Sequence, residues 1–209
     1  MHQILPTSYF GSIFQFALIV QHKNYQVDAY EHFIKQSYRN RCEIAGANGS
    51  LKLIVPLEKW KNHCQTRDIK ISHDENWQIQ HWRSIESAYR TSPYFEFYED
   101  DLKPLFFLEE SHLLEYNLQV EAELKALLQI GTEQQLTESY EASSPDWRTI
   151  IHPKNNKLLE KVDFPNYIQV FESKFGFIPN LSILDLIFNL GPNSKNYLEN
   201  ISLEAWQKK

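Results

Sequence analysis

Residues 35–56, KQSYRNRCEIAGANGSLKLIVP, contain the strongest fold signal in this chain. The stretch turns at Gly46-Ala-Asn-Gly49, and Asn-Gly between apolar residues is the strongest short-range signal for a β-hairpin. We therefore predict two strands, 41–44 and 51–56, that pair across this turn.

Three cations, Lys35, Arg39 and Arg41, lie just before the turn. Bringing cations together is costly unless an anion or several carboxylates neutralise them. Tyr38 and Asn40 add hydrogen-bonding groups between the cations. We expect these five residues to bind an anionic substrate. The alternative is a solvated strand edge, where Lys and Arg discourage pairing with other strands.

The composition of the 209-residue chain is that of a soluble globular protein, with 42% hydrophobic and 23% charged residues. The aromatic fraction of 14% can build a core together with a flat-walled pocket. No apolar run approaches the roughly 20 residues of a membrane span, and no secretory signal is recognisable, so we expect a cytoplasmic protein without a membrane span. Cys42 and Cys64 lack metal-site spacing, and we interpret both as free thiols.

The formal charge of −6 hides an uneven distribution along the chain. Residues 35–70 contain eight Lys and Arg against three Asp and Glu, whereas residues 94–146 contain two Lys against thirteen acids. A basic segment within an acidic chain favours a local site for a small anion. A nucleic-acid-binding protein usually has a whole basic face, so nucleic acid is not the expected partner.

Apolar periodicity and turn residues predict further elements along the chain. The expected strands are 4–6, 24–30, 69–71 and 167–171, and the expected helices are 9–21, 78–91, Leu113–Leu127 and Ile183–Leu190. Without repeats or a linker, this order predicts one domain over residues 1–209. Its class is α/β, with a small mixed sheet flanked by helices and a helical C-terminal part. We expect the strands near 3–6, 25–29 and 51–56 to share that sheet.

A second polar cluster lies on the predicted helix 78–91. Arg83 occupies one flank, where it could join the anion site, and His81 shares another flank with Ser84. His81 is the candidate catalytic base, the alternatives being a hydrogen-bond donor to the anion or an ordinary surface residue. No glycine-framed nucleophile elbow surrounds Ser84, which argues against a hydrolase.

Asp185 lies within the apolar helix Ile183–Leu190 and is the third candidate position. If the carboxylate is buried it needs a partner, and Arg39 or Arg41 would suit, which would add Asp185 to the substrate site. The alternative is a solvent-facing Asp near the helix start, where it interacts favourably with the helix dipole.

The sequence names no cofactor. It has no glycine-rich phosphate loop, because its six glycines are not suitably spaced. Its histidines show no metal-site spacing with Glu or Cys, so we expect no metal site.

Several segments together carry a resemblance to a known family, over most of the chain and in the same order. They are KQSYRNR at 35–41, GANG at 46–49 with Val55-Pro56, HWRSIESAY at 81–89 with SPYF at 92–95, and PNLSILDL at 179–186. On these motifs the chain resembles the WbqC-like protein family. Many members open with His-Gln-Pro, whereas Ile4 and Leu5 precede Pro6 here, and His2-Gln3 lies two positions early.

Members of this family occur in bacterial surface-polysaccharide (O-antigen) gene clusters. The resemblance implies a transferase that adds an amino acid such as glycine to a nucleotide-linked or otherwise anionic sugar. The alternative is a non-catalytic protein that binds an anionic sugar or nucleotide in the same pocket. The Ile4-Leu5 replacement favours this alternative, because it removes the family histidine.

Overall fold

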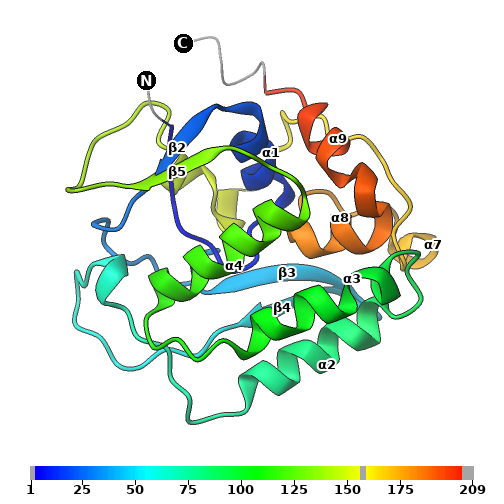
Figure 1. The fold of residues 1–209 in the computed structure, drawn as a ribbon, viewed down its shortest axis with the longest axis horizontal. Helices are drawn as coiled ribbons and strands as arrows, with labels where there is room; N and C mark the ends of the chain where they lie inside the picture. The colour runs from blue at the N-terminus through cyan, green and yellow to red at the C-terminus, as the bar shows by residue number, and fades with distance from the viewer. Residues whose placement is uncertain (1–2, 156–158, 204–209) are drawn as a thin grey trace.

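Three short parallel strands form the main sheet of the computed structural model, which describes residues 3–155 and 159–203. They are β1 (Gln3–Leu5), β2 (Asn24–Val27) and β5 (Glu133–Leu136), with β2 in the centre. Leu5 lies opposite Val27, and Val27 lies opposite Leu136, so the carboxyl ends of all three strands meet at one edge (Figure 1). That edge is where the candidate site is found.

The predicted hairpin is confirmed as a separate two-stranded sheet. β3 (Arg41–Gly46) pairs antiparallel with β4 (Gly49–Ile54). Gly49 has φ 104°, a backbone conformation that favours glycine, which explains the Asn-Gly turn. The expectation that this segment joins the strands near 3–6 and 25–29 in one sheet is wrong, because β5 occupies the second edge of β2.

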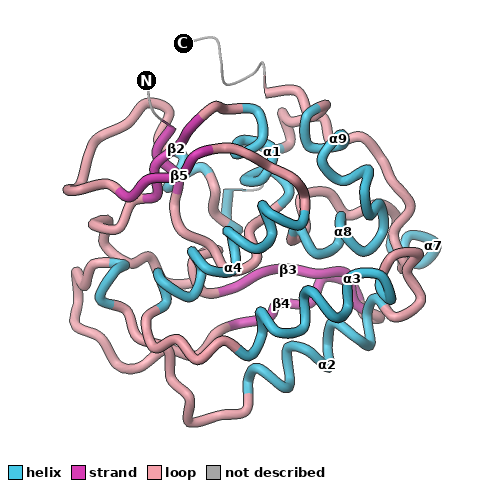
Figure 2. The backbone as a smooth tube through the Cα atoms, in the orientation of Figure 1, coloured by secondary structure: helices cyan, strands magenta, loops and turns pink. Residues whose placement is uncertain are grey.

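The helices surround the two sheets (Figures 1 and 2). Those described are α1 (Ile13–Gln21), α2 (Trp77–Tyr89), α3 (Phe95–Leu102), α4 (Leu113–Leu127), α5 (Trp147–Ile150), α7 (Glu172–Phe175), α8 (Ile183–Leu190) and α9 (Ser194–Glu199). Short 3-10 turns lie at Thr66–Asp68, Lys103–Phe107, Pro153–Asn155 and Gly191–Asn193. In Figure 1, α4 runs between the parallel sheet and the hairpin, and α8 and α9 form the helical C-terminal part. One hydrophobic cluster joins residues from both sheets and from all of these helices except α7, which makes the protein a single α/β domain.

The start of α1 differs from the expectation. The helix begins at Ile13, with Ser12 as its N-cap, and not at residue 9 as expected. A Cβ at Gly11 would lie 2.7 Å from the Ser8 hydroxyl oxygen, and Phe10 has φ 43°. The chain between β1 and α1 is therefore a tight non-helical loop.

Two of the expected strands are not strands. Residues 69–71 make only isolated bridges, in which Ile71 lies opposite Leu57. Residues 167–171 do alternate in burial, with Ile168 81% exposed between buried neighbours, but they pair with no strand of the described chain. The buried side chains in this segment are held by side-chain hydrogen bonds, described below.

Candidate functional site

The carboxyl edge of the parallel sheet is built around Asp28, the residue that follows β2. Its side chain is fully buried. Oδ1 accepts hydrogen bonds from the backbone N–H of Tyr30 (2.9 Å) and of Glu31 (3.0 Å), and from the hydroxyl of Thr137 (3.1 Å), which follows β5. Ligand sites of parallel sheets typically lie at this edge.

Arg148, in the short helix α5, completes the environment of Asp28. Its guanidinium pairs with Asp28 through Nη1 and with Asp146 through Nε at 2.8 Å, while only 3% of the side chain is exposed. The ring of Tyr140 lies 4.5 Å from the guanidinium carbon. Sequence reasoning missed Arg148, because the segment around it carries loop signals and Asp28 is far away along the chain.

Arg39 lies against the same network and is fully buried. Nε donates to Oε1 of Glu31 at 2.7 Å, and Nη2 donates to Oε2 of Glu31 and to the carbonyl of Arg148 at 3.4 Å. Burial raises the pKa of the Glu31 carboxyl, while the charge of Arg39 acts in the opposite direction. Part of the Arg39 guanidinium is thus neutralised inside the protein. Its third nitrogen, Nη1, is buried without a hydrogen-bond partner among the described residues.

Arg41 has a similar unpartnered atom, because its Nε is buried and donates to no acceptor in the described part of the chain. Burial lowers the pKa of His152, and the charges of Arg39, Lys154 and Arg41 lower it further. These four residues therefore lie close enough to interact electrostatically, and we call them the cationic cluster. A buried donor without a partner is costly and calls for an explanation, such as a bound ion.

A cavity of about 480 Å³ opens over the buried network at the sheet edge. Its lining includes Glu31, Asp146 and Arg148, together with the rings of Tyr30 and Tyr140. This volume and this mixture of aromatic and charged groups are typical of small-molecule sites. We call it the edge cavity.

Of the other predicted ligand residues, Asn40 is held in a structural role. Its Nδ2 donates to the backbone carbonyl of Val55 at 3.0 Å, and the backbone carbonyl of Asn40 accepts from the Val55 N–H at 2.8 Å. Lys35 is exposed, with its ammonium 5.3 Å from the ring centroid of Trp60, and Arg83 is exposed on α2. Tyr38 is 4% exposed and lines a different cavity, described below.

His81 is buried within an aromatic cluster. Its Nδ1 lies 2.8 Å from the hydroxyl of Tyr9, and the ring also hydrogen-bonds to the backbone of Ile54. Burial lowers the pKa of His81 to about 4, although the Ile54 contact acts in the opposite direction. Its 6% exposure and these contacts are those of a structural histidine. The structure does not place His81 on the wall of the edge cavity, so a role as base stays a prediction.

The expected pairing of Asp185 with Arg39 or Arg41 is wrong, and so is the solvent-facing alternative. Asp185 is fully buried and accepts from the hydroxyls of Tyr89 (2.8 Å) and Tyr167 and from Nε2 of Gln169 (2.9 Å). Burial raises its pKa, while these hydrogen bonds lower it. Neutral donors therefore satisfy the carboxyl. These contacts also explain why the 167–171 segment alternates in burial without strand pairing.

Two further features of the described residues concern metal ions and membranes. No group of three or more His, Cys, Asp or Glu within residues 3–155 and 159–203 is arranged to hold a metal ion. No described helix combines the length and apolarity needed to span a bilayer. His2, which could replace the family histidine only in a shifted register, lies outside the described residues.

Fold and site together define a small α/β protein with buried cations beside the edge of a parallel sheet. The sequence model of the WbqC-like protein family matches residues 8–160, and the chain belongs to this family. The matched residues include the cationic cluster and the residues that line the edge cavity. A relative described as "Uncharacterized protein Rv1507c", from Mycobacterium tuberculosis (strain ATCC 25618 / H37Rv), is 27% identical over 194 residues, which cover 79% of this chain and 83% of that protein. No solved structure matches.

Proposed function

We propose that the protein binds an anionic small molecule, such as a nucleotide-linked sugar, through the cationic cluster. The observation that carries this proposal is the pair of buried nitrogens, Arg39 Nη1 and Arg41 Nε, that have no partner among the described residues. Guanidinium groups match phosphate and carboxylate oxygens in geometry and charge. An anion in the cluster would satisfy both nitrogens and offset the repulsion that the neighbouring cations exert on His152.

The reaction we propose is a transfer in bacterial surface-polysaccharide biosynthesis. An aminoacyl group such as glycyl passes from an activated acyl donor to a hydroxyl or amino group of the bound sugar, and the donor's carrier leaves with the proton that the acceptor loses. Family membership supports this reaction class, since the cluster lies within the matched residues. The edge cavity, beside the cluster's partner Glu31, has the size for the non-anionic part of a substrate.

A non-catalytic binding protein is the second candidate, and one observation favours it. The predicted base, His81, is buried and hydrogen-bonded to Tyr9, and its lowered pKa makes it a weak base at neutral pH. Binding alone needs no such base.

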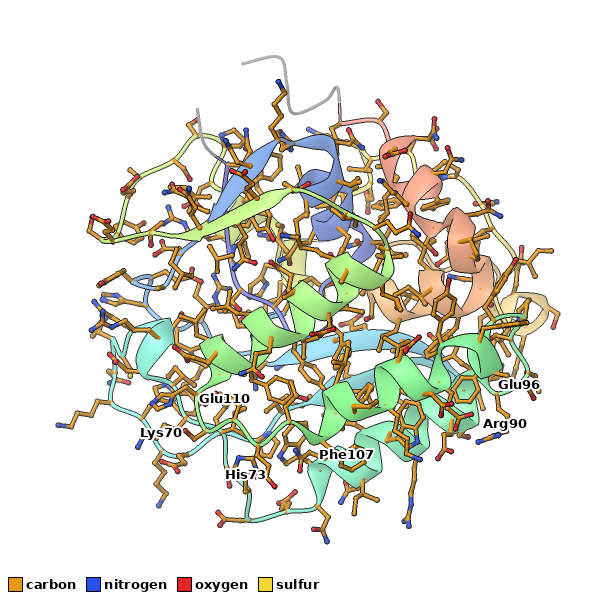
Figure 3. All side chains as sticks on the ribbon, viewed as in Figure 1. Lys70, His73, Arg90, Glu96, Phe107 and Glu110 are labelled. Atoms are coloured by element: carbon orange, nitrogen blue, oxygen red, sulfur yellow. The ribbon has the colours of Figure 1, made fainter. Side chains whose placement is uncertain are left out.

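Isothermal titration with a nucleotide sugar and with inorganic pyrophosphate tests the binding proposal. Arg41→Ala is the informative variant, because it removes an unpartnered guanidinium, whereas Arg39→Ala would also leave Glu31 buried and unpaired. We expect Arg41→Ala to weaken binding about tenfold to a hundredfold, as expected for one charge-assisted hydrogen bond of about 1.5–3 kcal/mol. The matched control is Arg90→Ala at the end of α2, where Arg90 pairs with Glu86 and is 55% exposed (Figure 3).

Equal affinities in the wild type and in Arg41→Ala would refute the assignment. Mass spectrometry of the ligand after incubation with candidate aminoacyl donors then separates the two functions. A mass increase on the sugar identifies a transferase, and an unchanged sugar with tight binding identifies a binding protein.

A further inference from the structure

A second and larger cavity, of about 700 Å³, lies beside β3 and has no role in the anion site. It is lined by Tyr38, by Glu43 of β3, by Ser50 of β4, and by residues of the segments 159–166 and 177–181, the second of which leads into α8. We call it the β3 cavity. Its volume is in the range of small-molecule sites.

The polar lining of the β3 cavity is acidic. Its charged groups are the carboxylates of Glu43, Glu160 and Asp163, and no Lys or Arg is found among the described residues of the lining. Ser50, Asn166 and Asn180 are its neutral polar residues besides Tyr38. The charge of Glu43 is only weakly neutralised, because the half-exposed Lys52 holds its Nζ 3.8 Å from Oε1 of Glu43. No ion pair of Asp163 or Glu160 is found within the described residues. Ionised carboxylates only accept hydrogen bonds, so this lining selects a ligand that donates.

Tyr38 gives the second, independent indication of a ligand. The side chain is 4% exposed and lines the cavity, yet its hydroxyl makes no hydrogen bond to a described residue. Burial raises the pKa of Tyr38, and the charge of Glu43 raises it further, so the phenol is neutral and stays available as a donor and acceptor. The hydroxyl of a buried tyrosine side chain is normally hydrogen-bonded, whereas this one lies on a side chain that lines an open cavity.

The apolar part of the lining includes the rings of Phe164 and Phe177. Aromatic faces attract cations, and carboxylates pair with ammonium groups. We infer that the β3 cavity binds a protonated primary amine, with the ammonium held between Glu43 and Asp163 and in reach of the Tyr38 hydroxyl. The amine is carried either on a hydroxylated ring, as in an amino sugar, or on a short chain, as in an aminoacyl group.

Arg41 links this cavity to the cationic cluster, because its charge also acts on Tyr38. The amine site nevertheless stands apart from the proposed function, since probes without an anionic group test it alone. Glucosamine carries the amine on a hydroxylated ring, and glycinamide carries it on a short chain. Glucose is the neutral counterpart of glucosamine.

Ligand-observed NMR and titration calorimetry with these three probes test the inference. We expect at least one amine to bind about tenfold more tightly than glucose. The amine that binds better shows whether the ligand carries its amine on a hydroxylated ring or on a short chain. Glu43→Gln should weaken that binding about tenfold or more, as expected for a lost charge-assisted bond. Glu96→Gln, at an exposed position of α3 (Figure 3), is the matched control and should bind as the wild type does.

Tyr38→Phe and Asp163→Asn provide second variants in case Glu43→Gln does not fold, which circular dichroism would show. Each should weaken amine binding without affecting pyrophosphate binding. The inference is overturned if neither amine binds, if glucose binds as well as glucosamine, or if the cavity variants bind the amine as tightly as Glu96→Gln does.

Discussion

Replacing His81 by Gln should remove a pH dependence of stability that the buried imidazole imposes. Burial lowers the pKa of His81 to about 4 in the folded protein, against the ordinary value of 6.5. Between these two values the unfolded chain binds a proton that the folded protein does not. Stability therefore rises with pH through this window, and it is lost as the pH falls from about 6.5 to about 4.

The magnitude follows from the shift. Each unit of pKa corresponds to about 1.4 kcal/mol, so a shift from 6.5 to about 4 costs the wild type roughly 3 kcal/mol of unfolding free energy on acidification. Glutamine can keep a hydrogen bond to Tyr9 but does not titrate. The free energy of unfolding of the wild type, relative to that of His81→Gln, should therefore fall by roughly this amount between pH 7.5 and pH 4.

Urea denaturation at several pH values measures this difference. Glu31, Glu121 and Asp185, whose pKa values burial raises, contribute in the opposite direction, but they are present in both proteins and cancel in the comparison. Parallel stability profiles for the wild type and His81→Gln would refute the burial argument. Should product formation be detected, a loss of turnover of about a hundredfold in His81→Gln with unchanged ligand affinity would restore His81 as the base.

Two further predictions concern the buried carboxylates. Arg148→Met should destabilise the protein by about 3–5 kcal/mol in urea denaturation, because it leaves Asp28 buried without its cation. Adding Asp28→Asn to this variant should restore part of the lost stability. A cost of Arg148→Met below about 1 kcal/mol would contradict the pairing. Asp185→Asn should cost about 1–3 kcal/mol at pH 7, because an amide NH₂ cannot accept from the tyrosine hydroxyls. Burial raises the pKa of Asp185 above the ordinary value of 3.8. The contribution of this group to the free energy of unfolding is therefore full below pH 3.8 and is lost as the pH rises through the raised pKa. The free energy of unfolding of the wild type should exceed that of Asp185→Asn by more at pH 4 than at pH 7.

Local sequence signals predicted the hairpin and four of the eight described α-helices, α1, α2, α4 and α8, because their causes are local. The Asn-Gly turn determines the hairpin, and apolar periodicity determines α2, α4 and α8. β5 was missed because Glu133-Gln-Gln-Leu136 contains no β-branched or aromatic residue; it is a strand because β2 offers it an edge. Residues 167–171 pair with no strand of the described chain, and their buried residues Tyr167 and Gln169 hydrogen-bond to Asp185 instead.

The site could be predicted only in part, because its contacts are long-range. The sequence indicated that Arg39 and Arg41 need anions, and their unpartnered nitrogens are consistent with that need. It could not show that Glu31 already takes two nitrogens of Arg39, nor that Arg148, 120 residues from Asp28, completes the sheet edge. Helical periodicity did not show that His81 lies inside the core, because one polar residue on a flank has the same pattern in either environment.

The imidazole of His152 offers the most direct measurement of the central claim, since it reports the potential within the cationic cluster. Its pKa is lowered by burial and by Arg39, Lys154 and Arg41. NMR titration of the ring protons, assigned with His152→Gln, gives this pKa with and without inorganic pyrophosphate. We predict that pyrophosphate raises the pKa of His152, by neutralising the surrounding cations, and that Arg41→Ala reduces this rise. A His152 pKa that stays the same at saturating pyrophosphate would contradict an anion site in the cluster.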